Sequence, residues 1–265
     1  ETKGKNREQK DVDQLIGATL DILPIRPGAV DARALADRDR VLGTGRPVAP
    51  IKTKEGDLLV TGIRPGLLVP PSASPGAIAV ERAMRTVGVE LETFDLPQFN
   101  SAGDGPVNTA RNLAFPLKYR FVDEFKADEG SFDKLRRDYN QLAKKTGAPI
   151  VDDALRLNLA GQLNLMDPET LRQARGTKTN EIGGFRRAVQ KYVSKGIPVL
   201  WVMCDGMIGD NPGAKRQITV MLIIGMNPAK DEVLYLDPSD PSGATRRMTF
   251  HDGWCVTLNV GAIIR

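Results

Sequence analysis

The sequence has few of the residues from which catalytic and metal sites are commonly built. It contains a single histidine, His251, and two cysteines, Cys204 and Cys255. One imidazole excludes chemistry that needs two, and one histidine with two distant cysteines does not make a zinc site. We therefore expect the protein to use neither a metal nor a cofactor.

Long apolar runs and concentrated positive charge are also missing. No stretch of about 18 apolar residues occurs, so the sequence predicts no membrane-spanning helix. The net charge is only +4, and basic residues alternate with acids, as in ADRDR (36–40) and KLRRD (134–138). Because nucleic-acid binding needs a basic stripe, we expect no nucleic-acid partner.

The two cysteines are too few for a disulfide scaffold. Both lie in apolar, strand-like contexts, VLWVMC (199–204) and WCVTLNV (254–260), which favours buried free thiols. A single disulfide between them is the alternative if the protein is exported. The chain begins at Glu1, so we expect that an upstream segment was removed, either by choice of the expressed boundaries or by cleavage of a secretory signal.

The chain divides into an arm and a main domain. Residues 1–59 are predicted to form a short helix, from about residue 11 to 20, and an irregular arm rich in proline and glycine. Residues 60–265 are predicted to form one domain. Within the Pro/Gly-rich region, only GDLLVTGI (56–63) has the alternation of a strand.

Helices come first in the main domain and antiparallel strands follow. Helical spacing of apolar residues predicts helices over 75–88, 130–147 and 182–196, with a further helix beginning at Asp167 and Pro168. Apolar runs predict strands over 197–203, 218–226, 232–238 and 254–264. This order is typical of an α+β protein.

The helix over 75–88 begins well but carries inert residues in its first turn. Ser74 is suited to cap it, and Pro75 fits the first helical position, where its missing N–H costs nothing. A buried stripe follows, formed by Ala77, Val80, Met84 and Val87. The pattern predicts a helix that packs on a core but begins without a reactive side chain.

Four segments resemble the papain-like cysteine peptidase fold, in the branch related to bacteriocin-processing (double-glycine leader) peptidases. They are AVERAMRTVGVELE (79–92), DYNQLAKKTG (138–147), SKGIPVLWVM (194–203) and TVMLIIGMNPAKDEVLYLDPSDPSGATRRMTF (219–250). The resemblance implies a helical half packed on an antiparallel β-sheet. It also implies an exported protein, whether periplasmic, envelope-associated or extracellular.

The resemblance also implies that the catalytic residues of this family are replaced. The nucleophilic cysteine of the family falls on Pro75, or on Ser74 after a slip of one residue. The histidine falls on Thr219, which cannot act as a general base near neutral pH. Asp237 matches the residue that orients the imidazole, but it has no histidine to orient, and GLLVPP (66–71) offers no oxyanion-hole glutamine.

We therefore expect a catalytically inactive peptidase homologue, because a triad that acts as a unit fails when one member is lost. Its expected role is to bind a peptide or protein partner in the cleft, or to serve as a structural protein. The alternative is an active hydrolase that uses Ser74 or Cys204. His251 is expected to be a surface residue near a turn, and the sequence does not indicate the oligomeric state.

Overall fold

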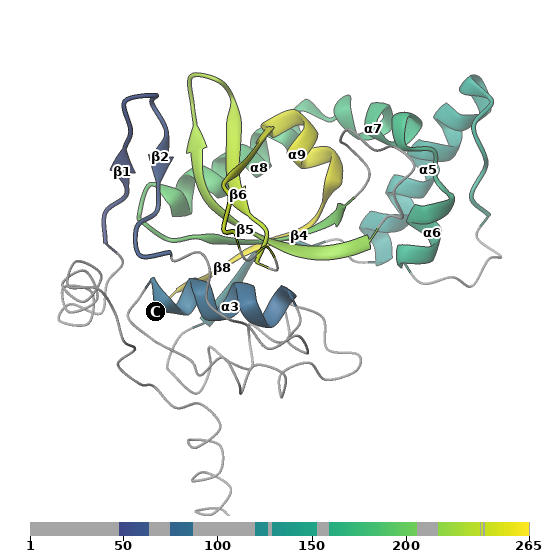
Figure 1. Cartoon of the computed structure of the whole chain (residues 1–265). Coiled ribbons are helices and arrows are strands. Elements are labelled where there is room, and N and C mark those ends of the chain that lie inside the picture. The colour runs from purple at the N-terminus through teal and green to yellow at the C-terminus, as the bar shows by residue number, and fades with distance from the viewer. Residues whose placement is uncertain are drawn as a thin grey trace, which may run out of the picture.

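The computed structural model describes residues 48–63, 75–86, 120–126, 129–152, 159–205, 217–238, 240 and 242–264. Within these residues the chain forms an antiparallel sheet with helices packed on it (Figure 1). The predicted α+β class is confirmed. The helix predicted near residues 11–20, and Ser74 before the helix over 75–88, lie outside the described residues.

The sheet contains eight described strands, and all their pairings are antiparallel. Their order across the sheet is β1-β2-β5-β4-β8-β3, and β6 joins β5 to β7. Their bounds are β1 Ile51–Lys52, β2 Leu58–Leu59, β3 Arg120–Lys126, β4 Val199–Asp205, β5 Gln217–Asn227, β6 Glu232–Leu236, β7 Arg246–Thr249 and β8 Thr257–Ile264. Three of the four predicted strands, those now labelled β4, β5 and β6, are confirmed within two residues.

One long strand, β5, organises the sheet. Its first part pairs with β4, from Gln217 to Ile223, and its last residues pair with β2 at Gly225 and Met226. Because β6 occupies the other side of both parts, β2 and β4 lie end to end along the same side of β5. The hairpin of β1 and β2 therefore extends the sheet beyond the point where β4 begins.

Helices cover both faces of the sheet. α3 (Pro75–Arg85) lies on one face, and α8 (Thr179–Val193) and α9 (Phe250–Val256) lie on the other (Figure 1). A group of α5 (Glu129–Thr146), α6 (Leu159–Leu165) and α7 (Pro168–Gly176) stands beside them, and α7 packs against both α5 and α9. The predicted helices over 75–88, 130–147, 182–196 and from Pro168 are thus confirmed.

The beginnings of α7 and α9 follow from local capping. The carboxylate of Asp167 accepts a hydrogen bond from the Thr170 amide at 2.8 Å, and Pro168 occupies the first turn of α7. The hydroxyl of Thr249 accepts from the Asp252 amide at 3.0 Å and so caps α9. The strand predicted over 254–264 was therefore wrong at its start: residues 254–256 finish α9, and β8 begins at Thr257.

The core beneath α8 and α9 is aromatic. The Phe185 ring lies 5.9 Å from Trp201, 5.7 Å from Phe250 and 6.2 Å from Trp254, and Trp201 meets Tyr235 edge to face at 5.2 Å. All five side chains are buried. Such pairs add to the free energy gained from burying their area, so this cluster fixes α8 and α9 on the sheet.

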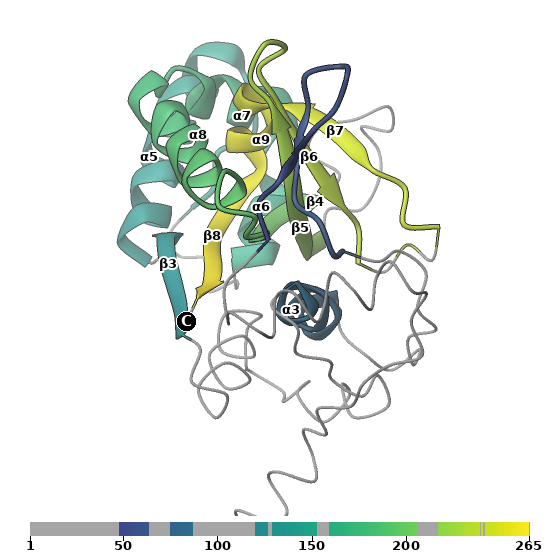
Figure 2. The ribbon, with the colours of Figure 1, turned by 90° about the vertical axis from the view of Figure 1, so that its left-hand side faces the viewer.

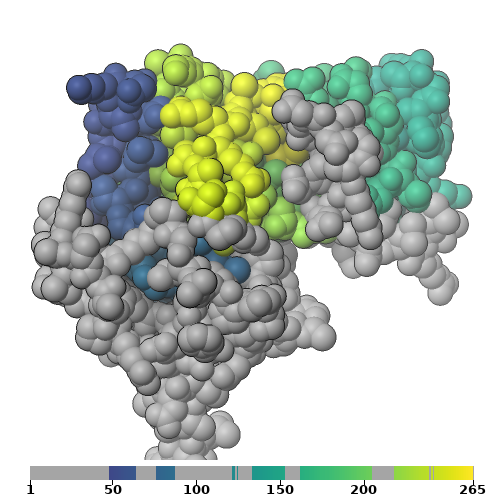
Figure 3. Space-filling view, in the orientation of Figure 1, coloured from purple at the N-terminus to yellow at the C-terminus, as the bar shows by residue number. Residues whose placement is uncertain are grey.

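An ion pair joins the hairpin of β1 and β2 to the C-terminal strands. Asp57, in the turn region between β1 and β2, forms an ion pair with Arg247 of β7, and it is buried in doing so. In the space-filling view the hairpin, in dark blue and purple, lies beside the yellow-green C-terminal strands (Figure 3). β1 and β2 lie within the segment predicted as an arm, and they belong to the same sheet as the strands of the main domain.

Candidate functional site

The structure does not bring the sequence-predicted site residues together on one face. Pro75 is the first residue of α3. Thr219 pairs with Met203 of β4, and because side chains alternate along a strand, both lie on the face of Trp201. Trp201 packs against α8, whereas α3 lies on the opposite face (Figure 1).

Asp237 follows β6 and is surrounded by arginines. Its carboxylate lies 3.3 Å from Nη2 of Arg246. It is also close enough to α3 to act on Arg82, which is buried there, and whose Nε and Nη1 have no hydrogen-bond partner. Burial lowers the pKa of the Arg82 guanidinium, and the carboxylates of Glu81 and Asp237 oppose that shift. Arg246 and Arg82, the two arginines near Asp237, are cations and cannot serve as a base.

Both thiols are free and buried, so the structure contains no disulfide between Cys204 and Cys255. Cys255 is fully buried in α9, and its Sγ lies 3.5 Å from the carbonyl oxygen of Arg172. Burial raises the pKa of this thiol to about 11. A thiol in this state is protonated near neutral pH and is a poor nucleophile. Cys204 is buried in β4, where it pairs with Ile218.

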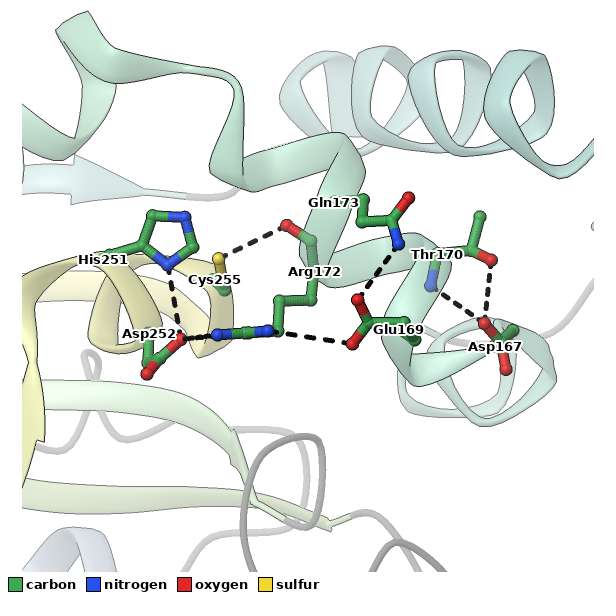
Figure 4. A network of polar contacts seen from close by, with 8 residues as sticks. All are labelled: Asp167, Glu169, Thr170, Arg172, Gln173, His251, Asp252 and Cys255. Carbon is green, nitrogen blue, oxygen red and sulfur yellow. Dashed lines mark hydrogen bonds and ion pairs between the residues drawn. The ribbon is translucent and has the colours of Figure 1, made fainter. Parts of the chain in front are cut away.

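His251 belongs to a polar network between α7 and α9 (Figure 4). Its Nδ1 lies 3.3 Å from the Asp252 carboxylate, which also accepts hydrogen bonds from Nε and Nη2 of Arg172 at 3.0 and 2.9 Å. Burial opposes the ionised form of Asp252, but the hydrogen bonds from Arg172 and His251 hold its pKa below the ordinary value. The network therefore bridges two helices through a charged carboxylate.

His251 and Cys255 lie close together in the structure, which was not predicted from the sequence (Figure 4). They are four residues apart on α9 and so lie on the same side of the helix, with Asp252 beside them (Figure 4). The pattern Thr249-x-x-Asp252 was a capping signal that could have revealed this helix. The group still lacks an accessible nucleophile, because Cys255 has no exposed surface.

A cavity of about 410 Å³ lies beside α8, where this helix meets α9 and the strands β3 and β8. We call it the α8 pocket. Its lining comes from α8, α9 and the two strands β3 and β8, which lie beside α8 in Figure 2. The lining residues are Glu124, Glu181, Gly184, Phe185, Arg187, Ala188, Lys191, Trp254 and Val260.

The pocket has an apolar floor and a charged rim. Phe185, Trp254 and Val260 are buried and form the floor, and Glu124, Glu181, Arg187 and Lys191 surround it. Pockets of about 300–1,000 Å³ with a mainly apolar lining and a few placed polar groups are typical ligand sites. The geometry is therefore that of a site that can hold a small ligand or a single side chain of a partner.

Three of the four rim charges are paired. Lys191 forms an ion pair with Glu124, which also accepts a hydrogen bond from the Tyr192 hydroxyl. Burial raises the pKa of Glu124, but these hydrogen bonds outweigh it and hold the pKa below its ordinary value. Glu181 faces Nζ of Lys134 at 3.5 Å.

Comparisons with known proteins assign no function to this pocket. No family model matches the chain, and no curated protein or solved structure matches it significantly. No helix within the described ranges is long and apolar enough to cross a membrane. In the same part of the chain, no three or more His, Cys, Asp or Glu side chains gather in a group that could hold a metal ion.

Proposed function

We propose that this chain is a non-catalytic binding protein that holds its ligand in the α8 pocket. The observation that carries the proposal is the pocket itself: a cavity of about 410 Å³ with buried aromatic residues at its floor and charged groups at its rim. Apolar area gives such a site its affinity, and the few charged groups orient the ligand.

The residues around the pocket favour binding over catalysis. Among the described residues, the lining contains no cysteine, serine or histidine, so this part of the chain brings none of the usual nucleophiles and no imidazole base to the pocket. Its two carboxylates, Glu124 and Glu181, each face a lysine. The two thiols of the chain are buried elsewhere.

A papain-like, pseudoenzyme origin is a separate part of the proposal. It is supported by the order of the four sequence segments and by the α+β class. The binding proposal does not depend on it, because the α8 pocket lies on the face of the sheet opposite α3. The ligand we envisage is a peptide or a protein tail that inserts one apolar residue, or a small molecule of similar size.

Binding at the pocket is testable with a variant that fills it. A Cβ added at Gly184 would meet only Nη2 of Arg187, at 3.9 Å, so Gly184→Leu can project into the pocket without a clash at its first atom. Gln190→Leu is the matched control, because it adds a leucine to the same helix at an exposed position that does not line the pocket. Binding is followed by ¹H–¹⁵N spectra during titration with small apolar acids, amides and amines.

We expect at least one probe class to shift the signals of Phe185, Ala188 and the Trp254 indole. The shifts should persist in Gln190→Leu and vanish in Gly184→Leu. If no probe shifts these signals, or if Gly184→Leu changes nothing, the pocket does not bind and the proposal fails.

The non-catalytic part has its own test. The protein is incubated with a broad set of fluorogenic peptides and with thiol- and serine-reactive probes. We expect no turnover. Turnover that disappears in Ser74→Ala or Cys204→Ala would instead establish the alternative, an active hydrolase.

A further inference from the structure

We infer that the α8 pocket selects an apolar carboxylate and that Arg187 anchors the carboxyl group. This inference rests on the proposed binding function and adds the chemical class of the ligand. It follows from the charges of the rim, from two glycines of α8 and from the aromatic floor.

Arg187 is the rim charge that has no acidic partner among the described residues. Lys191 is neutralised by Glu124, and Glu181 faces Lys134. The Arg187 side chain is exposed on the wall of the pocket. A guanidinium presents a planar fork of donors that matches a carboxylate with two parallel hydrogen bonds. An anionic group on the ligand would complete the pairing of charges around the rim.

The glycines Gly183 and Gly184 make room for this guanidinium. Glycine inside a helix is destabilising relative to alanine, yet α8 carries two in succession. Neither has a positive φ, so the backbone does not require them. A Cβ at Gly183 would come within 3.3 Å of Nη1 of Arg187, and one at Gly184 within 3.9 Å of Nη2.

The guanidinium therefore lies against the bare surface of its own helix, next to the pocket. Side chains at these two positions would crowd Arg187 or reduce the pocket volume. The two destabilising glycines thus lie where the Arg187 guanidinium meets the pocket. The two glycines therefore support the role of Arg187 independently of the argument from the paired charges of the rim.

The floor of the pocket indicates the chemical nature of the apolar part of the ligand. Phe185 and Trp254 present ring surface and Val260 presents branched alkyl surface. An aromatic ring packs on such a floor through offset or edge-to-face contacts. A ring joined to a carboxylate through a short linker has the apolar part that the floor takes and the negative charge that Arg187 takes. Such a group occurs in free aromatic acids and in the C-terminal residue of a polypeptide.

The first arm of the test compares charge states of one ligand. N-acetyl-phenylalanine, its C-terminal amide and phenethylamine are titrated into the full chain and followed by calorimetry and ¹H–¹⁵N spectra. Because the Arg187 side chain is exposed, an ion pair with it contributes at most about five-fold in affinity. We therefore expect the acid to bind about two- to five-fold more tightly than the amide. Phenethylamine should bind no better than the amide.

The second arm changes the arginine. Arg187→Gln should weaken acid binding to the level of the amide and leave amide binding unchanged, and Arg187→Lys should retain part of the preference. Arg186→Gln is the matched control, because the neighbouring Arg186 on the same helix pairs with Asp231 and does not line the pocket. It should leave the ratio of acid to amide affinity unchanged.

The third arm separates the two sources of the carboxylate. A tetrapeptide ending in phenylalanine is compared with N-acetyl-phenylalanine, each as acid and amide. Tighter binding of the peptide acid assigns the site to polypeptide C-termini, and equal binding assigns it to free acids. Both results support the anchor at Arg187.

Two results would overturn the inference. One is equal affinity for acid and amide in the unchanged protein. The other is tightest binding of phenethylamine. If these ligands still lose binding in Gly184→Leu, the pocket remains a binding site and only its carboxylate preference is wrong. If no ligand of any charge binds, the proposed function fails as well.

Discussion

Arg247 of β7 forms a bidentate ion pair with Asp57 of the hairpin. Its Nη1 donates to Oδ1 at 3.0 Å and its Nη2 donates to Oδ2 at 2.5 Å. Asn227 of β5 donates to the same carboxylate at 2.7 Å. The hydrogen bond from Arg247 is the main cause that holds the pKa of Asp57 below its ordinary value. Burial opposes it and Asn227 supports it. Three segments distant in sequence thus meet at one charge.

We predict that this carboxylate makes stability depend on acid pH. Because the folded-state pKa is depressed, its contribution is fully present above the unfolded pKa, about 4. It is lost as the pH falls through the lower folded value. Asp57→Asn should therefore lower the free energy of unfolding near neutral pH and flatten the profile below about pH 4. Urea denaturation from pH 2 to pH 7 measures both, and parallel profiles would contradict the prediction.

Cys255 should be inert in the folded protein and should reduce stability at alkaline pH. Its folded pKa is about 11, against about 8.5 for an unfolded thiol. The folded state therefore holds this proton more tightly, and stability should fall between these pH values, by up to about 1.4 kcal/mol per pH unit.

The Cys204→Ala variant isolates this thiol. Its reaction with Ellman's reagent at pH 8 should be negligible when folded and complete in denaturant. Adding Cys255→Ala should remove part of the alkaline loss of stability between pH 8.5 and 11. Rapid labelling of the native protein would show that Cys255 is accessible and would contradict this placement.

The Tyr139 hydroxyl should contribute strongly to the stability of the group of α5, α6 and α7. Its buried hydroxyl donates to the Pro149 carbonyl oxygen at 2.8 Å and accepts from the Asp167 amide at 2.8 Å. Tyr139→Phe keeps the ring and leaves both backbone groups without this partner, so we expect a loss of about 1–3 kcal/mol. Urea denaturation measures it, and a change below about 0.5 kcal/mol would show that solvent replaces the hydroxyl.

Gly225 should be needed for the docking of the hairpin. A Cβ there would lie 2.6 Å from the Leu58 carbonyl oxygen and 2.7 Å from Cδ2 of Leu59. Gly225→Ala should push β2 away from β5 and speed the hydrogen exchange of the Val60 amide, which donates to the Ile224 carbonyl at 2.8 Å. Gly183→Ala is a control that should leave this exchange rate unchanged. Equal exchange in both variants would contradict the close approach.

Local signals carried much of the fold. The capped start at Asp167 and Pro168 and the apolar spacing of α5 were sufficient to predict helices there. The apolar run over 218–226 was sufficient to predict the strand that became β5. The run over 254–264 failed because three apolar residues fit the end of a buried helix as well as the start of a strand.

The candidate site could not be predicted from the sequence, for a different reason. The α8 pocket joins Glu124, Arg187 and Val260 from three elements far apart in the chain, and no spacing rule brings them together. The paired glycines at 183 and 184 were the one local signal, since they weaken an otherwise strong helix pattern. The predicted positions Pro75 and Thr219 depended on a resemblance that fixes residue order but not the sheet face.

Because β2 and β4 lie end to end along β5, the hairpin of β1 and β2 covers the part of the β5 edge that β4 does not reach. With residues 48–63 displaced, the peptide groups of β5 near Gly225 and Met226 would face solvent as an open edge, and such edges recruit foreign strands. A hairpin from another molecule could satisfy the same groups. With the hairpin in place, these peptide groups of β5 are paired, and the short two-residue strand β1 forms the edge of the sheet on that side.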